Sequence, residues 1–571
     1  MEIPRPEYPR PQFARENWKN LNGTWAFEID NGRSGQARRL FEEDAMLNSN
    51  ILVPFCPESA LSGVGHKDFM YGVWYQRKVT LTDAELSGRT VLHFGAADYR
   101  TYVYVNGQLA GTHQGGYVSF AFDISKLVRA GENTLTVYCE DDTRDPMIPR
   151  GKQSEEYFSH NCDYTRTTGI WQTVWLEFMP CTYISSVRYD PEPADASVMI
   201  EAELCGTGTF TVEAFYEGRP VGSVSAASCG GHLVLKLPLS EKHLWEPGAG
   251  RLYDLKLTYG EDQVSSYVGL RSVRIDGYRF LLNDRPVFQR TILDQGFYPD
   301  GIYTAPSEEA LVRDIELSMS CGFNGARLHQ KVFEERFLYH CDRLGYLVWG
   351  EYPNWGLDHT RPEAVFAILP EWLEEVARDY NHPAIIGWCP FNETWDVNGR
   401  KQDDEVLRAV YLATKAADRT RPCIDTSGNY HVVTDIFDVH DYEQNVEKFT
   451  AHFARLVPED IVENHCNARQ TYTPGQAFFV SEYGGIRWSV RDKGDEAWGY
   501  GNAPRTEAEY MARYEGLTTA LLRNPKIMGF CYTQMTDVEQ EQNGVYTYQR
   551  EEKFPAEFFR RVNTQKAAIE E

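Results

Sequence analysis

Two glutamates stand at the ends of two apolar, strand-like segments in the second half of the chain. Glu393 closes the run AIIGWCPFNE (residues 384–393), and Glu482 closes QAFFVSE (residues 476–482). Each run is too short for a typical core helix and is bounded by turn residues, which predicts a buried strand. Taken singly, such a glutamate is a solvated rim ion pair. As a pair at two strand ends, they are the groups needed to hydrolyse a glycosidic bond, one as acid and one as nucleophile or base.

The segments around these glutamates alternate between strand and helix from about residue 276 onward. This rhythm predicts a parallel sheet, and eight strands in a region of this length predict a (β/α)₈ barrel. Glu393 then ends strand four and Glu482 ends strand seven, both at the C-terminal rim. The expected strands are 285–293, 324–330, 346–352, 384–393, 422–427, 435–442, 477–484 and 527–537, and the expected helices are 307–321, 333–344, 370–380, 403–418, 507–523 and 555–568.

The first half of the chain reads as all-β. Short alternating runs separated by turn residues extend to about residue 180, and Asn106-Gly107 between two of them predicts a two-residue hairpin. We expect a jelly-roll β-sandwich over residues 1–180, an immunoglobulin-like β-sandwich over 181–275 and the barrel over 276–571. The chain is therefore predicted to be a multidomain β plus α/β protein.

Composition limits the classes of partner. The 571 residues carry a formal charge of −26, with dispersed basic residues, which argues against nucleic acid. No apolar run is long enough to span a membrane, and the N-terminal segment lacks the apolar core of a signal peptide. The 12 cysteines form no CxxC pair, and Cys321, Cys389 and Cys531 sit in apolar runs, as buried free thiols do. We expect a cytoplasmic protein without membrane partners.

At this point the chain resembles glycoside hydrolase family 2, the β-galactosidases, β-glucuronidases and β-mannosidases. The resemblance covers nearly the whole chain, in the order of its three expected domains and in several short motifs. These motifs are Thr168-Gly169-Ile170-Trp171, Gly322-Phe323-Asn324-Gly325-Ala326-Arg327, Cys341-Asp342-Arg343-Leu344-Gly345 and the two glutamate segments. The resemblance implies that Glu393 is the general acid/base, that Glu482 is the nucleophile, and that the anomeric configuration is retained.

The residues themselves agree with these roles. An acid must be protonated before the bond breaks, so we expect the pKa of Glu393 to be raised by apolar neighbours, namely Trp388, Phe391 and Trp395. The nucleophile must stay ionised and needs donors. Arg327 at the end of strand two is the candidate cation, with a rim ion pair as its alternative.

Two more polar residues belong to this core of the predicted site. Tyr442 at the end of strand six is a second donor to the nucleophile and matches a tyrosine of the family; an aromatic residue that faces a sandwich is its alternative. Asn392 is a candidate for the sugar 2-OH, a contact that strengthens in the transition state.

Further positions are candidates for binding the sugar. By resemblance to β-galactosidases, Asp163 would reach the 4-OH and Asn543 would lie near the 6-OH, although each is equally a loop residue bonded to its own turn. His440 is expected to orient Tyr442 or the sugar, or to be a core histidine.

Three aromatic residues are candidates for stacking on the sugar. They are Trp355, Trp488 and Tyr532, and a place in the barrel core is the alternative for each.

The chain departs from the family's patterns at three places. His329 is displaced by one position from the family's histidine, and strand alternation implies that His329 and Gln330 cannot both face the barrel interior. Residues 541–543 read Glu-Gln-Asn where β-glucuronidases have an Asn-x-Lys pair that grips the substrate carboxylate, so an anionic sugar would meet repulsion from Glu541. Gly485 replaces a histidine of large β-galactosidases.

The sequence therefore predicts a retaining exo-β-glycosidase, most similar to β-galactosidases, that acts on a carbohydrate substrate. β-Glucuronidase, β-mannosidase and arabinopyranosidase specificities remain open within the same family, as does homo-oligomerisation. A carbohydrate-binding protein without activity is the rival from another class. No metal-ligand cluster and no nucleotide-binding motif occurs, so we expect no cofactor and no metal.

Overall fold

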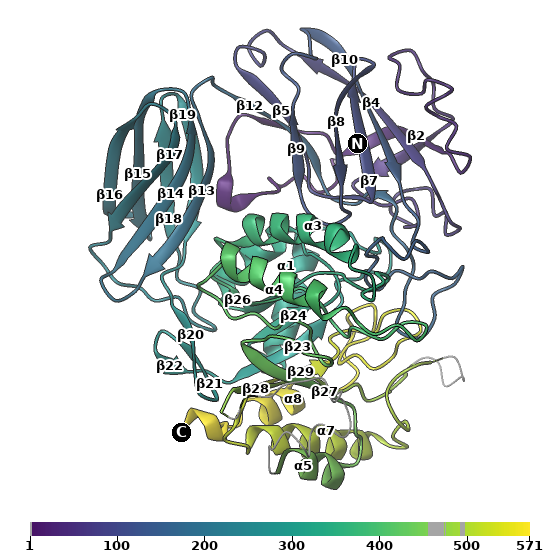
Figure 1. The fold of residues 1–571 in the computed structure, drawn as a ribbon, viewed down its shortest axis with the longest axis vertical. Coiled ribbons are helices and arrows are strands. Elements are labelled where there is room, and N and C mark those ends of the chain that lie inside the picture. Colours follow the sequence, from purple (N-terminus) through teal and green to yellow (C-terminus); the bar gives the residue numbers. More distant parts are fainter. Residues whose placement is uncertain (1–2, 455–472, 474, 491–496) are drawn as a thin grey trace.

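The computed structural model describes residues 3–454, 473, 475–490 and 497–571. It contains a jelly-roll β-sandwich, an immunoglobulin-like β-sandwich and a parallel β-barrel wrapped by helices, as expected. In Figure 1 the two sandwiches lie side by side on one side of the barrel. The barrel therefore contacts both sandwiches, and its mouth can receive residues from outside its own sequence.

The first sandwich packs a six-stranded sheet, ordered β3-β2-β4-β10-β7-β8, against a four-stranded sheet, ordered β1-β12-β5-β9. The predicted hairpin forms: Asn106 and Gly107, both with positive φ, join β7 to β8 through the Val105–Gln108 pair. The bounds are β1 (Trp18–Asn20), β2 (Gly23–Ile29), β3 (Ser49–Val53), β4 (Val73–Leu81), β5 (Arg89–Phe94), β6 (Ala97–Asp98), β7 (Arg100–Val105), β8 (Gln108–Gln114), β9 (Phe120–Asp123), β10 (Gly131–Glu140), β11 (Gly169–Ile170) and β12 (Val174–Met179).

The second sandwich packs the sheet β13-β14-β17 against the sheet β16-β15-β18-β19. Period-two alternation builds its core, since Tyr253, Leu255, Leu257 and Tyr259 of β18 are buried while the residues between them are more exposed. The bounds are β13 (Tyr183–Glu192), β14 (Ser197–Cys205), β15 (Gly208–Tyr216), β16 (Arg219–Ser228), β17 (Gly231–Pro238), β18 (Tyr253–Tyr259) and β19 (Asp262–Val268), and a small sheet of β20 (Val273–Asp276), β21 (Arg279–Leu282) and β22 (Arg285–Pro286) follows.

The parallel sheet of the barrel has the order β26-β25-β24-β23-β29-β28-β27. The expected fifth strand, residues 422–427, forms only two parallel bridges to the segment around β26, Trp388–Cys423 and Asn392–Ser427. Here the Asp425 carboxylate accepts hydrogen bonds from the backbone amides of Val432 and Val433. These side-chain bonds replace the backbone hydrogen bonds of a second strand ladder. The bounds are β23 (Gln289–Asp294), β24 (Gly325–Leu328), β25 (Leu347–Glu351), β26 (Ile385–Cys389), β27 (Ile436–Asp441), β28 (Ala477–Gly484) and β29 (Ile527–Thr533).

The predicted helices form, although the one expected over residues 555–568 ends at Asn563, and two further differences occur. The helix expected over residues 370–380 begins at Ala364 and contains Pro370, because its apolar stripe of Ala364, Ile368, Trp372 and Val376 continues across the proline. A further helix, α5, was not predicted. The bounds are α1 (Glu308–Ser320), α2 (Glu335–Leu344), α3 (Ala364–Asp379), α4 (Asp404–Ala417), α5 (Val446–Ala454), α7 (Glu507–Leu522) and α8 (Ala556–Asn563).

The expectation that Glu393 closes strand four is wrong in detail. Strand β26 ends at Cys389, because Pro390 has no amide hydrogen to continue the ladder. Glu393 lies four residues further, in a turn with φ of 47°, and its amide donates to Ser427 O at 2.8 Å. Glu482 lies inside β28, near its C-terminal end.

The eleven cysteines in the described residues are unpaired, and Cys321, Cys389 and Cys531 are buried as predicted. Within the same residues, no helix combines the length and the apolar character that crossing a bilayer requires.

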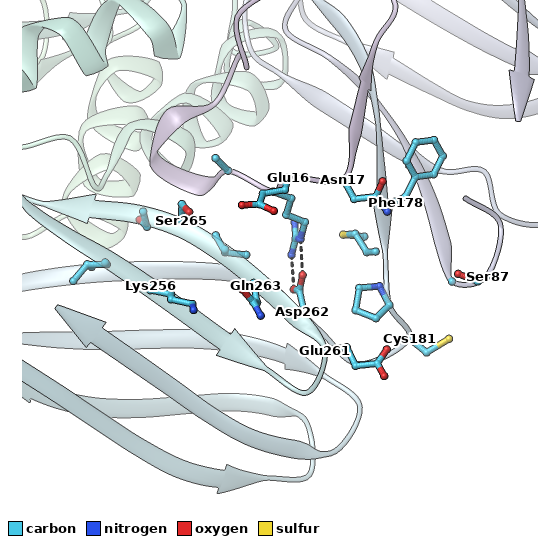
Figure 2. A pocket seen from close by; sticks show the side chains of 18 of the residues that line it. Glu16, Asn17, Ser87, Phe178, Cys181, Lys256, Glu261, Asp262, Gln263 and Ser265 are labelled. Atoms are coloured by element: carbon cyan, nitrogen blue, oxygen red, sulfur yellow. Dashed lines mark hydrogen bonds and ion pairs between the residues drawn. The ribbon is translucent and has the colours of Figure 1, made fainter. Parts of the chain in front are cut away.

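The two sandwiches meet at a cavity of about 1040 Å³ (Figure 2). Arg15 crosses this junction and donates to Asp262 at 2.9 and 2.8 Å and to Glu177 at 3.1 Å. The lining residues include neither Glu393 nor Glu482. This cavity is thus a junction between the sandwiches, held by a buried arginine, and the candidate site lies elsewhere.

Candidate active site

Glu482 lies in the barrel mouth, where a cation and a hydroxyl group contact its two carboxylate oxygens. Arg327, at the C-terminal end of β24, donates from Nη1 to Oε1 of Glu482 at 3.1 Å, and the Tyr442 hydroxyl donates to Oε2. Both neighbours lie where the strand order predicted them. Burial by itself would raise the pKa of Glu482, but the charges of His440, His329 and Arg327 outweigh burial and lower it. The carboxylate is therefore held ionised.

A second carboxylate, Glu351, holds Arg327 in place and was missed by the sequence reasoning. Arg327 Nη2 lies 2.6 Å from Oε2 of Glu351 and 2.9 Å from Oδ1 of Asn392. Both Arg327 and Glu351 are fully buried, so the pair fixes the guanidinium in one orientation. The apolar run YLVWGE, which ends at Glu351, was the available sequence signal.

His329 also faces this carboxylate cluster. Its Nδ1 lies 2.8 Å from Oε1 of Glu351 and 4.0 Å from Oε1 of Glu482. Gln330 is buried too, and its amide donates to Glu351. The expected alternation of the two side chains does not apply, because β24 ends at Leu328 and Gln330 adopts a φ of 51°.

Glu393 and Glu482 face one another. A carboxylate oxygen of each, together with a ring nitrogen of His440, lies within 4.8 Å of the others. His440 Nδ1 lies 2.6 Å from Oε1 of Glu393. Two carboxyl groups this close match the roughly 5–5.5 Å of retaining glycosidases and fall short of the roughly 6.5–9.5 Å of inverting ones.

The expected raised pKa of Glu393 is wrong for this ligand-free site. Burial acts to raise the pKa, but the hydrogen bond and charge of His440 outweigh it, and the pKa is lowered. The apolar neighbours also contribute less than expected, since Trp395 is 52% exposed and the Trp388 indole is bonded to Asp418.

Asn392 is buried, and its Nδ2 has no hydrogen-bond partner among the described residues.

The first sandwich supplies a cation to the site, which the sequence reasoning missed. Lys152 is 5% exposed, and its Nζ lies 3.8 Å from the centroid of the Trp355 ring. The Trp355 indole donates to Asn392 O at 3.1 Å, so the lysine lies near the turn that carries Glu393. Burial acts to lower the pKa of Lys152, but Cys162, Glu541, Asp163 and Glu393 raise it. In the described part of the chain this ammonium has no ion-pair partner within 4.0 Å.

The first-domain loop around Lys152 is bonded to the barrel. The Tyr164 hydroxyl donates to Glu541, and Thr165 donates to Glu539 at 2.6 Å. Asp163 is paired with Arg150 at 2.6 Å, and its carbonyl accepts from Gln540 at 3.0 Å. Asp163 thus lies beside the site but is already tied to its own loop, the alternative left open above.

Asn543 lies beside Glu541 and donates to it at 2.8 Å. It is fully buried, and its Oδ1 has no partner within the described residues.

Gly485 leaves space for Tyr500, since a Cβ at this glycine would lie 2.3 Å from the Tyr500 ring. Tyr500 stacks on Tyr442 with 3.4 Å between centroids, and this aromatic pair was not predicted.

Two of the predicted stacking residues belong to the core. Tyr532 is fully buried and packs edge-on against Tyr483 and Tyr514. The Trp488 ring packs against Tyr510 and Phe554. Of the three candidates, only Trp355 lies beside the glutamate turn.

Among the described residues, two groups of side chains have the spacing of metal ligands, and members of both are already paired with other side chains. In the first group His440 contacts both Glu393 and Glu482, and Glu482 also accepts from Arg327 and Tyr442. Glu155, His160 and Asp163 form the other group, in which Arg150 already pairs with Glu155 at 2.7 Å and with Asp163. Arg150 thus brings a positive charge to two of the three members of this group.

Comparison with known proteins agrees with this geometry. Residues 64–180 match the sugar binding domain of glycosyl hydrolases family 2, and residues 273–487 match the TIM barrel domain of the same family. A β-glucuronidase of Felis catus is 29% identical over 479 residues, covering 74% of this chain and 70% of that protein. A β-galactosidase of Thermoanaerobacter pseudethanolicus is 26% identical over 458 residues, covering 75% and 57%.

Solved structures share the whole fold. A β-glucuronidase from an uncultured Clostridium sp. superposes with a TM-score of 0.79 at 22% identity, covering 97% of this chain and 99% of that one. A Ruminococcus gnavus β-glucuronidase in complex with D-glucuronic acid superposes with a TM-score of 0.78 at 21% identity, covering 98% and 100%. With the domain order and both family models in agreement, this chain belongs to glycoside hydrolase family 2 and is a glycosidase.

Proposed function

We propose that the protein is a retaining exo-β-glycosidase that acts by double displacement. The short separation of Glu393 and Glu482, with carboxylate oxygens within 4.8 Å, carries this proposal. Glu482 attacks the anomeric carbon while Glu393 protonates the leaving oxygen. Glu393 then deprotonates the water that releases the sugar from Glu482.

The surroundings of each group support its role. Arg327 and Tyr442 keep Glu482 ionised and orient it toward one face of the sugar. The unpartnered Nδ2 of Asn392 is a free donor for the 2-OH. The first-domain loop is bonded to Glu539 and Glu541, and we infer that it limits one end of the site, as an enzyme acting on a terminal sugar requires.

For the sugar, β-glucuronides are the class that we place first, ahead of the β-galactosides expected from sequence. Several curated relatives, led by the cat protein, are named β-glucuronidase. Residues 541–543 lack the lysine that β-glucuronidases have in their Asn-x-Lys pair, and Lys152 supplies a buried cation instead. Burial raises the pKa of Glu541 against the lowering effect of Lys152, Tyr164 and Asn543, and a raised pKa weakens the expected repulsion.

A β-galactoside is the second candidate, favoured by a different observation. Asn543 holds an unpartnered, buried Oδ1 at the position where β-galactosidases have an asparagine near the 6-OH. A hydroxymethyl group can donate to this oxygen, whereas a carboxylate cannot.

A panel of 4-nitrophenyl glycosides tests the proposal: β-D-glucuronide, β-D-galactoside, β-D-mannoside and α-L-arabinopyranoside. We expect the highest kcat/KM with the glucuronide and a product that keeps the β configuration by NMR. A higher value for the galactoside would favour the second candidate. A protein that binds one of these sugars yet hydrolyses none would be the carbohydrate-binding rival, and an α product would exclude double displacement.

A further inference from the structure

His440, on β27, lies between the two glutamates. Its Nδ1 is 2.6 Å from Oε1 of Glu393, and its Nε2 is 3.4 Å from Oε1 of Glu482. The same Nε2 lies 3.0 Å from Oγ of Ser427. A role in orienting Tyr442 was expected, but the closest contact of His440 in the site is with the acid/base.

A buried chain behind His440 sets which ring nitrogen carries a hydrogen. Ser427 donates its hydroxyl proton to Oδ2 of Asp438 at 2.6 Å, so its oxygen remains to accept from Nε2–H of His440. His431 lies between Asp438 and Asp425, at 3.0 and 2.7 Å, and these acids raise its pKa to about 10 against the effect of burial. The positive charge on His431 keeps Asp438 ionised, so the Asp438 carboxylate can only accept hydrogen bonds. Nε2 therefore keeps its hydrogen, and Nδ1 is the nitrogen that faces Glu393.

The position of the ring requires a glycine at residue 428. Gly428 packs against it, and a Cβ there would lie 2.5 Å from Nδ1 of His440. Gly428 has a φ of 93°, which a side chain would disfavour further. Backbone contact on one side and Ser427 on the other thus hold Nδ1 against the carboxylate of Glu393.

We propose that His440 and Glu393 share the one proton that the acid step consumes, and that His440 is a positioning residue that stores this proton at Nδ1. The proposal rests on the proposed function. In the empty site the proton is on Nδ1 and Glu393 is a carboxylate. When a glycoside binds, the proton passes to Oε1 of Glu393 and His440 becomes neutral.

The later steps replace this proton with one from the water that releases the sugar. Glu393 gives it to the leaving oxygen as the C1–O bond breaks and Glu482 bonds to C1. In the second step Glu393 takes a proton from water, the hydroxide bonds to C1, and Glu482 leaves as a carboxylate. The proton on Glu393 can then return to Nδ1, which restores the starting state.

The charges around His440 favour keeping this proton at neutral pH. Glu393 faces it from the turn after β26, Glu482 from β28, and Asp438 from its own strand, while Arg327 on β24 is the opposing cation. Arg327 is already paired with Glu351 and Glu482. Burial acts to lower the pKa of His440, but the two glutamates raise it. The pair should therefore release its proton at a higher pH than a glutamic acid alone.

The test uses two glycosides of the best sugar from the panel, one with a 2,4-dinitrophenyl and one with a phenyl leaving group. His440→Asn keeps a donor near Nδ1 but cannot store a proton, and Ser427→Ala removes the acceptor that sets the ring. For His440→Asn, we expect kcat/KM with the phenyl glycoside to fall on the order of 100-fold, and with the dinitrophenyl glycoside less than roughly 10-fold. The alkaline limb of the phenyl pH profile should move down by roughly one pH unit.

Ser427→Ala should move the same limb in the same direction by a smaller amount, and it keeps the proposal testable if His440→Asn does not fold. His243→Asn, on the second sandwich, is the matched control and should leave both profiles unchanged. Equal losses on the two glycosides, or an unmoved alkaline limb in the active variants, would overturn the proposal while leaving the proposed function intact. A wild-type protein that hydrolyses no glycoside overturns both.

Discussion

The ammonium of Lys152 lies 3.8 Å from the centroid of the Trp355 indole, which joins a cation of the first sandwich to an aromatic side chain at the barrel mouth. A cation over an indole face is held by the ring quadrupole without being neutralised. Lys152 therefore keeps its charge for a substrate. Specificity in this chain should then depend on a residue outside the barrel.

Lys152→Met is the first prediction, because it keeps the length of the side chain and removes the charge. We expect kcat/KM for 4-nitrophenyl β-D-glucuronide to fall by about 10–100-fold, the range for loss of a charged hydrogen bond. The value for the neutral β-D-galactoside should change less than about 3-fold, because no carboxylate is lost. Equal losses on both sugars would assign Lys152 to structure alone.

Glu482→Ala should reduce kcat for every glycoside in the panel by at least about 10⁴-fold, because the glycosyl-enzyme bond can no longer form. The isosteric Glu482→Gln variant should behave in the same way while melting close to the wild type. Steady-state assays with a dinitrophenyl glycoside measure the loss. Residual turnover within about 10-fold of wild type would assign the nucleophile to another residue.

Glu393→Ala should spare the first step for substrates with good leaving groups, because these need no acid. The second step should become limiting, so added azide should raise the rate and yield a β-glycosyl azide. Product analysis by NMR distinguishes the anomers. An α-glycosyl azide would show that the roles of Glu393 and Glu482 are reversed.

Glu351→Gln tests whether Glu351 orients the nucleophile Glu482 by holding Arg327 in place. The variant breaks the buried pairs with Arg327 and His329, and the cost of breaking one buried pair is about 3–5 kcal/mol. We expect a lower Tm and a kcat reduced by about 10–100-fold, because Arg327 loses its orientation. Glu316→Gln, on the exposed face of α1, is the control and should match the wild type in both measurements. A Glu351→Gln protein with wild-type kcat would remove Glu351 from the mechanism.

Buried carboxyl groups in the first domain predict how stability depends on pH. Burial raises the pKa of Glu58 to about 7 and that of Asp141 to about 8, whereas unfolded carboxyls titrate near pH 4. The folded state thus binds more protons, and stability falls as pH rises through these values. Between about pH 5 and 8, the Tm of the wild type relative to that of Glu58→Gln should therefore fall by about 2–4 °C. A Tm difference between the two proteins that does not change with pH would contradict the assignment.

Local patterns were enough to predict the architecture. Period-two runs with turn residues indicated both sandwiches, Asn106-Gly107 indicated its hairpin, and the strand–helix rhythm indicated the barrel. The errors lie where local signals compete. Proline ended β26 before Glu393, side-chain bonds of Asp425 replaced a strand ladder, and an apolar stripe carried α3 across Pro370.

The sequence by itself determined which carboxylates meet, because parallel strands bring their C-terminal ends to one rim, and so Glu482 was expected beside Arg327 and Tyr442. Only the tertiary structure decided the ionisation of the pair. The pKa of Glu393 depends on His440, 47 positions away along the chain, through a 2.6 Å contact that no local pattern encodes. The same holds for Lys152, because charge acts through space and a loop of another domain can bring it to the barrel mouth.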